Sequence, residues 1–262
     1  MVHASLAGKR VFGIAGRWSR RAAGGVLDLL LPPRCLACSA VTDQPGGLCA
    51  DCWRDMPFLE QPWCARYGTP FSHDIGKDGL SPRAIAEPPV FDRARAATHY
   101  SGPARDLVLA LKFSRRRELA GPMGSWMVRA GREFLDENSV IVPVPLHRFR
   151  LWQRHFNQAA DLARAVAEMS GGTYVPELLH RNRRTRQQVG LDAVARQRNV
   201  RGAFGIRKDL EEIVYGKQAV LVDDVLTTGA TVTACTRILK SAGAASVDVL
   251  TFANADPASA LA

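Results

Sequence analysis

One run near the carboxyl end of the chain limits the possible folds more than any other feature. Residues 219–231 read Ala-Val-Leu-Val-Asp-Asp-Val-Leu-Thr-Thr-Gly-Ala-Thr. The apolar start predicts a buried strand that ends at two adjacent carboxylates, Asp223 and Asp224. The loop and helix start that follow offer unpaired backbone N–H groups and a positive dipole end, which suit a phosphate. The run therefore predicts an anion-binding strand–loop–helix unit.

The side chains of this unit are of two kinds, those suited to bind a phosphate and those suited to bind sugar hydroxyls. Gly229 permits a close approach or a positive φ, and the threonine hydroxyls add donors. The carboxylates would repel a phosphate, so they fit better beside ribose hydroxyls with Mg²⁺ nearby. We predict Asp223 and Asp224 as the catalytic, ribose-holding pair. The predicted phosphate-binding residues are Thr227, Thr228, Gly229, Ala230 and Thr231. The structural alternative is a buried strand and a capped helix without a ligand.

The regular part of the chain alternates strands with helices, which predicts an α/β fold with a parallel sheet flanked by helices. Predicted strands are Ala96–Tyr100, Val140–Val144, Gln218–Asp223 and Val247–Phe252. Predicted helices are Ala104–Phe113, Asn157–Met169 and Thr231–Ala242. No apolar run approaches the roughly 18 residues that cross a bilayer, so no membrane span is expected.

Four of the six cysteines form two C-x-x-C pairs, at Cys35, Cys38, Cys49 and Cys52. Four thiolates from two tight turns can close a tetrahedron around Zn²⁺, and a filled tetrahedron is typical of a structural site. The basic start of the chain lacks the apolar core of a secretory signal, so we expect a reducing, cytoplasmic location. Cys235 falls on the apolar face of a predicted helix and is expected in the core.

The chain carries a net charge of +10, which favours anionic partners. Residues 140–209 hold 13 Lys+Arg against five Asp+Glu. Within them, the loop after the predicted strand Val140–Val144 supplies three fork-shaped donors suited to a diphosphate, Arg148, Arg150 and Arg154. Interleaved aromatics at Phe149, Trp152 and Phe156 offer a second interpretation, a groove for single-stranded DNA. A solvated charged surface is the third.

Two family resemblances sharpen these expectations. Residues 219–231 closely resemble the phosphoribosyl-pyrophosphate (PRPP) signature of type I phosphoribosyltransferases, which implies that Asp223 and Asp224 contact ribose and that the loop holds the 5′-phosphate. The runs V-P-V-P-L-H, R-H-F-N-Q, T-R-Q-Q-x-G-L and R-N-V-R-G-A-F resemble the ComF/GntX family, PRPP-motif proteins linked to DNA uptake in competent bacteria. This second resemblance covers about residues 26–253.

The ComF/GntX resemblance also carries site residues and partners. It implies that Arg148, Arg150 and Arg154 lie near the pyrophosphate, and that a hood loop contains Thr185, Gln188 and Arg196. Such proteins often carry a second cysteine set, of which only Cys64 remains. Tyr67, Ser81 and Ala84 stand at its other positions. Competence-machinery proteins are implied as partners.

We therefore expect a basic leader at 1–25, a zinc-binding module with linker at 26–91, a phosphoribosyltransferase-like domain at 92–255 and a tail at 256–262. The leading function is a PRPP-binding protein, linked to competence, that transfers phosphoribose with Mg²⁺. The alternatives are a non-catalytic factor that binds single-stranded DNA and a nucleobase salvage enzyme. The sequence leaves the acceptor and the catalytic activity itself open.

Overall fold

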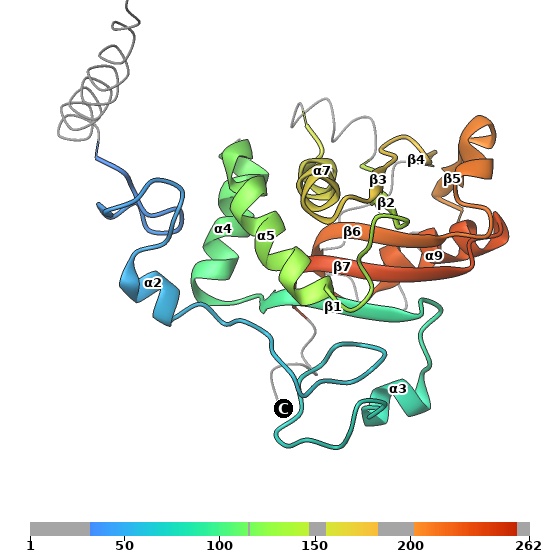
Figure 1. Ribbon diagram of the computed structural model, residues 1–262, viewed down its shortest axis with the longest axis horizontal. Coiled ribbons are helices and arrows are strands. Elements are labelled where there is room, and N and C mark those ends of the chain that lie inside the picture. The colour runs from blue at the N-terminus through green and yellow to red at the C-terminus, as the bar shows by residue number, and fades with distance from the viewer. Residues whose placement is uncertain (1–31, 115, 147–155, 183–201, 256–262) are drawn as a thin grey trace, which may run out of the picture. The chain divides into compact units, whose positions relative to one another are not determined.

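The predicted alternation of strands and helices builds a five-stranded parallel sheet. In the computed structural model, the residues that can be described are 32–114, 116–146, 156–182 and 202–255. The strands lie in the order β1-β7-β6-β2-β3, and every neighbouring pair is parallel (Figure 1). Their bounds are β1 Arg93–His99, β2 Val140–Pro143, β3 Thr173–Tyr174, β6 Gln218–Leu226 and β7 Ser246–Asn254. A separate antiparallel pair contains β4 Leu179–Arg181 and β5 Phe204–Ile206.

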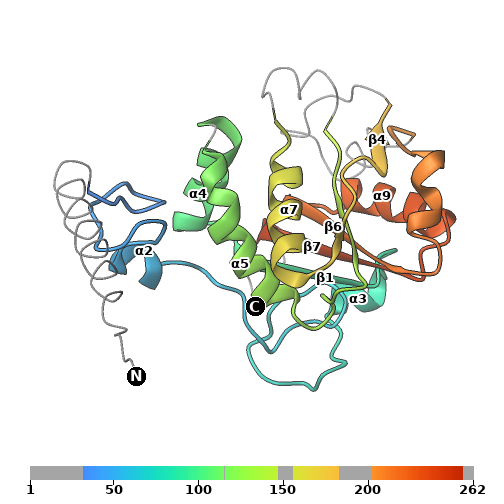
Figure 2. The ribbon, with the colours of Figure 1, turned by 45° about the horizontal axis from the view of Figure 1, so that its top comes forward.

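Helices cover both faces of the sheet. They are α4 Gly102–Phe113, α5 Ala120–Gly131, α7 Gln158–Ser170 and α9 Ala230–Ser241. Shorter helical pieces are α2 Ala50–Arg54, α3 Pro82–Ala86, η1 Arg117–Leu119 and η2 Lys208–Ile213. Helices α5 and α7 lie side by side in both views (Figure 1, Figure 2). A Cβ on Gly124 would lie 2.8 Å from the Cβ of Ala165, so a glycine permits this close packing.

The strand residues alternate between the two faces. Leu250 of β7 faces α5, since a Cβ on Gly131 would lie 3.1 Å from its Cδ1. Val249, the neighbouring residue, belongs to a buried apolar cluster with Val232 and Cys235 of α9. Helix α9 therefore covers the face opposite α5 and α7. The α/β class expected from the sequence, a parallel sheet flanked by helices, is confirmed, and Cys235 is a core residue as predicted.

The chain divides into two units, Met1–Trp53 and Arg54–Ala262, and the sheet belongs to the second. No helix among the described residues is long and apolar enough to cross a membrane. The predicted leader at 1–25, the tail at 256–262 and the stretches 147–155 and 183–201 lie outside the residues that the structure describes.

Candidate functional site

The two predicted carboxylates lie within β6, not at its end. The strand pairs with β7 as far as Leu226, opposite Asn254, so the predicted end at Asp223 is wrong by three residues. The reason is the apolar pair that follows the acids, Val225 and Leu226, which continues the ladder. The connecting loop is correspondingly short, residues 227–229, before α9 begins. Successive residues of a strand point to opposite faces, so each carboxylate has its own neighbours.

Asp224 is buried and pairs with a lysine of α4. Its Oδ1 lies 3.1 Å from Nζ of Lys112, and the two side chains are 6% and 21% exposed. Its Oδ2 is buried and accepts no hydrogen bond from any described residue. The sequence analysis did not identify Lys112. A usable signal exists, because Lys112 extends the buried stripe of Ala104 and Val108 by one more turn.

Asp223 lies in a different electrostatic environment. Burial and the charge of Asp224 together raise the pKa of Asp223 to about 7. The backbone N–H of Asp224, which donates to Oδ1 of Asp223 at 2.9 Å, and the charges of Lys112 and Arg181 act in the opposite direction. The guanidinium of Arg181 also stacks 5.0 Å from the ring centroid of Phe204. Two cations from α4 and β4 thus compensate an acid pair that would otherwise be costly to bury.

The loop after β6 has the geometry of an anion-binding turn. Gly229 is the N-cap of α9 with φ 76°, a left-handed conformation that favours glycine. The cap has no side-chain hydrogen bond, so the first N–H groups of this 12-residue helix have no capping acceptor from that residue. Oγ1 of Thr228 is buried and has no hydrogen-bond partner in the part of the chain that the structure describes. Thr227 is exposed, whereas Ala230 and Thr231 are partly buried.

A second strand end lies next to this loop. Strand β2 pairs with β6, and the N–H of Val144, just after β2, donates to the carbonyl of Val222 at 2.9 Å. Asn157 caps α7 by accepting from the N–H of Ala159, and its Nδ2 donates to the carbonyl of Val144. Phe156 is buried, so its ring belongs to the core and is not available to stack on DNA bases.

The six residues predicted for the pyrophosphate and the hood loop lie outside the described residues. They are Arg148, Arg150, Arg154, Thr185, Gln188 and Arg196.

The four predicted zinc ligands form one cluster. The Sγ atoms of Cys35, Cys38, Cys49 and Cys52 all lie within 4.8 Å of one another, and those of Cys38 and Cys49 are 3.7 Å apart. A zinc tetrahedron with Zn–S bonds of about 2.3 Å has edges of about 3.8 Å, so the donor set fits this metal. Burial alone would raise the pKa of Cys35, but hydrogen bonds from the backbone of Cys38 and Cys49 lower it to about 6.

A second turn repeats the backbone of the first cysteine turn. Cys35 donates its N–H to the carbonyl of Ala40 at 2.7 Å, and Cys64 does the same to Thr69 at 2.7 Å. The carbonyl of each cysteine accepts from the N–H four residues later, Ser39 in the first turn and Gly68 in the second. The φ angles of these two residues are 63° and 65°. The chain therefore contains two copies of one backbone turn, and only the first contributes to the four-cysteine cluster.

Other contacts occupy the ligand positions of the second copy. The ring of Tyr67 lies 4.5 Å from the guanidinium of Arg83 and packs edge-on against Phe91. The N–H of Ser81 donates to Sγ of Cys64 at 3.3 Å, and its Oγ accepts from Ala84. These contacts hold the second turn through side-chain packing and hydrogen bonds. Within the described residues, the four-cysteine group is the only cluster suited to a metal.

Comparisons with known proteins agree with both parts of the chain. A double zinc ribbon domain matches residues 26–85, and a phosphoribosyl transferase domain matches residues 160–261. The chain is 33% identical to the DNA utilization protein YhgH of Escherichia coli strain K12 over 211 residues, 78% of this chain and 88% of that protein. It is 27% identical to Competence protein F of Haemophilus influenzae over 228 residues, 85% of this chain and 97% of that protein. With these two domains and relatives of this similarity and coverage, the chain belongs to the ComF family.

Proposed function

We propose that this protein binds PRPP with Mg²⁺ at the β6–α9 loop and acts as a competence-linked phosphoribosyltransferase. The observation that carries the proposal is a pair of buried polar atoms, Oδ2 of Asp224 and Oγ1 of Thr228, which have no hydrogen-bond partner among the described residues. They flank the short connection to α9, whose N-cap residue Gly229 has no side chain. A buried carboxylate oxygen and a buried hydroxyl without partners are costly unless a ligand satisfies them. Ribose hydroxyls and a phosphate supply the complementary donors and acceptors.

The residues of β6 and of the loop after it would have the roles that the sequence suggests. Asp223 and Asp224 would accept hydrogen bonds from the ribose hydroxyls and orient the C1 carbon. The N–H groups of residues 229–231 and the hydroxyl of Thr228 would hold the 5′-phosphate. Mg²⁺ supplies charge neutralisation of the pyrophosphate leaving group. Lys112 would hold the side chain of Asp224 in place through their ion pair.

The transfer itself is a displacement at C1. The C1–O bond to pyrophosphate breaks through an oxocarbenium-like state, and a bond from C1 to the acceptor forms. Arg148, Arg150 and Arg154 would stabilise the leaving group from the loop after β2. The sequence offers no clear general base, so the acceptor would bring a nucleophilic lone pair, and its N–H proton would pass to the departing pyrophosphate or to water. Thr185, Gln188 and Arg196 would belong to a loop that closes over the substrate.

The activity is tested by pyrophosphate release from PRPP and Mg²⁺ in the presence of single candidate acceptors, namely nucleobases and simple amines. Release that depends on one acceptor and disappears in Asp224→Asn supports transfer. Binding of PRPP without release from any acceptor would show a PRPP-responsive protein without transferase activity. Absence of PRPP binding would overturn the proposal.

Binding of single-stranded DNA is the second candidate function, and the net charge of +10 and the relative named DNA utilization protein favour it. Contacts to phosphates would make the affinity fall steeply with salt. An oligonucleotide titration at two salt concentrations checks this. A salt-independent or undetectable affinity would remove the candidate.

A structural Zn²⁺ on the four cysteines and a cytoplasmic location complete the proposal. Reduced thiolates are the ligands that the metal requires, and a reducing compartment preserves them. Competence-machinery proteins are the partners that we expect from the family.

A further inference from the structure

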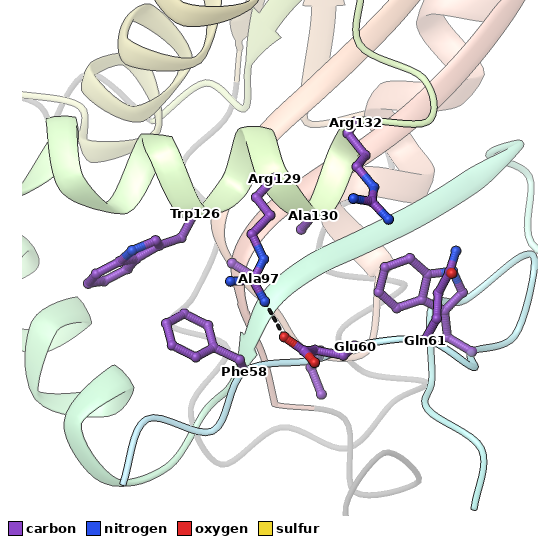
Figure 3. Close-up of a pocket in the computed structure, with 10 residues that line it drawn as sticks. Phe58, Glu60, Gln61, Ala97, Trp126, Arg129, Ala130 and Arg132 are labelled. Atoms are coloured by element: carbon purple, nitrogen blue, oxygen red, sulfur yellow. Dashed lines mark hydrogen bonds and ion pairs between the residues drawn. The ribbon is translucent and has the colours of Figure 1, made fainter. Parts of the chain in front are cut away.

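A pocket of about 280 Å³ opens beside β1, away from the β6–α9 loop (Figure 3). It forms because the preceding chain pairs with β1 and then leaves it. Leu59 donates its N–H to the carbonyl of Ala97 at 3.0 Å, and the chain returns only at Arg66, whose carbonyl accepts from Ala94. Between these two contacts the chain lies opposite α5 and leaves a hollow.

The floor of the pocket is small and apolar, and its walls are aromatic. Ala97 and Ala130 are buried and line it with methyl groups. Phe58 meets Trp126 edge to face, with ring centroids 5.6 Å apart. Trp63 lies 4.9 Å from the buried guanidinium of Arg95, measured from its ring centroid. Trp126 also packs against the buried ring of Phe252, with ring centroids 6.1 Å apart, so it belongs to the wall of the pocket. Trp63 is held by Arg95 and needs little reordering to receive a planar ligand.

The rim of the pocket carries an uncompensated positive charge. Arg129 forms an ion pair with Glu60, and its guanidinium lies 5.4 Å from the ring centroid of Phe58. Arg132 also lines the pocket and is exposed, and it has no ion pair or hydrogen bond to any residue that the structure describes. Figure 3 shows Arg132 directed toward the side of the pocket where Gln61 lies. The rim thus offers a free fork-shaped donor for a phosphate.

We propose that this pocket binds one nucleotide, with its base against the indole ring of Trp63 and its phosphate on Arg132. Aromatic rings stack on any base, and arginine forks match phosphate oxygens. The volume of about 280 Å³ lies at the small end of ligand pockets, which suits one nucleotide. Strand β7 separates β1 from β6, so the pocket lies about 10 Å or more from the carboxylates.

The same chemistry is presented by a free nucleoside 5′-monophosphate and by an unpaired nucleotide of single-stranded DNA. The proposal goes beyond PRPP binding, because PRPP has no base and uses the other loop. A nucleotide site at β1 can therefore fail or succeed independently of the proposed transferase function.

The test is a titration of the full chain with adenosine 5′-monophosphate, followed by the indole N–H signals of Trp63 and Trp126 in NMR spectra. Substitution of each tryptophan by phenylalanine assigns the signals. Arg132→Glu is the informative variant. Arg105→Glu is the matched control, since Arg105 is an exposed arginine of α4 outside the pocket.

We expect a saturable shift of the Trp63 indole signal, and no such shift with ribose 5-phosphate. Affinity should fall about tenfold in Arg132→Glu, as for loss of one charge-assisted phosphate contact, and stay unchanged in Arg105→Glu and in Asp223→Asn/Asp224→Asn. Absence of the Trp63 shift, or equal affinity in wild type and Arg132→Glu, would overturn the proposal. So would loss of binding in the aspartate variant.

To distinguish a free nucleotide from an unpaired nucleotide of single-stranded DNA, the affinities of thymidine 5′-monophosphate and a short oligothymidylate are compared at one fixed salt concentration. Tighter binding of the oligonucleotide, with the same loss in Arg132→Glu, assigns the pocket to single-stranded DNA. Equal affinity of the two probes assigns it to the free nucleotide.

Discussion

At the scale of single residues, the acid pair of β6 depends on a lysine that the signature run does not contain. A buried carboxylate is stable only with a charge or hydrogen-bond partner, and Lys112 supplies the charge for Asp224. The stability of the protein and the geometry of the proposed ribose site are thus linked through α4.

Replacement of Lys112 by methionine should therefore cost about 2–3 kcal/mol of unfolding free energy, because it leaves the buried carboxylate of Asp224 unpaired. Urea denaturation measures this loss. The control is Lys240→Met, whose partner Asp92 is 3.2 Å away in a more exposed pair, 36% and 34% exposed, and which should cost at most about 1 kcal/mol. Equal losses in the two variants would refute the role assigned to Lys112.

The raised pKa of Asp223 predicts a pH dependence of stability. The unfolded side chain loses its proton near the ordinary pKa of 3.8, whereas the folded one keeps it to a pKa of about 7. The folded state binds more protons in this window, so the contribution of Asp223 to the unfolding free energy falls as the pH rises from about 4 to about 7. Asp223→Asn should remove this fall. If the unfolding free energies of wild type and Asp223→Asn change in parallel between about pH 4 and about pH 7, the raised pKa of Asp223 is contradicted.

The identity of these functional residues was only partly accessible from the sequence. Asp223 and Asp224 stand out in the sequence because two adjacent acids rarely follow a run of buried apolar residues without a ligand. Lys112 does not stand out, because its role depends on α4 passing β6, a contact between residues 112 positions apart. The role of Arg132 in the β1 pocket is hidden for the same reason, since Phe58 and Trp63 reach the pocket from the distant segment before β1.

At the scale of elements, the β6–α9 loop depends on one glycine. Gly229→Ala places a side chain at φ 76° although space is available, since the nearest atom would be 3.9 Å from the new Cβ. We expect a loss of about 1 kcal/mol of stability and weaker PRPP binding as the loop shifts. Gly216→Ala is the control, with φ 68° and nothing within 4 Å. It should cost similar stability and leave PRPP affinity unchanged. A loss of affinity in both variants would contradict the local role of Gly229.

The predicted elements with clear periodicity are close to those observed, and the exceptions have physical causes. Helix α7, predicted as Asn157–Met169, is observed as Gln158–Ser170 between the N-cap Asn157 and a left-handed Gly171. Helix α5 was not predicted, because Gly121, Pro122 and Gly124 lower its intrinsic helix propensity. Its buried methionines and the close contact with α7 stabilise it instead. The sequence reports local propensity, whereas α5 depends on packing between segments.

At the scale of the whole molecule, the chain joins a metal-binding unit to a sheet-forming unit. Thiolate ligands are the main source of order in a short cysteine-rich segment with little apolar core. The sheet unit has its own extensive core and should not require the metal.

We accordingly expect one equivalent of zinc per purified chain, and loss of structure confined to the Met1–Trp53 unit when a chelator removes it. Metal analysis and limited proteolysis with fragment mapping check the two statements. Cys52→Ser should lose the zinc, whereas Cys64→Ser in the second turn should retain one equivalent. A metal-free protein that resists proteolysis throughout would contradict a structural zinc.

The central claim is that the β6–α9 loop is a PRPP site, and a calorimetric titration of PRPP with Mg²⁺ tests it most directly. Wild type should bind PRPP saturably. The matched control Asp106→Asn should bind it with equal affinity, because Asp106 is an exposed residue of α4 outside the loop. Asp223→Asn/Asp224→Asn should lose that binding while remaining folded. Undiminished binding in the double variant would place PRPP elsewhere, and no binding in wild type would contradict the account.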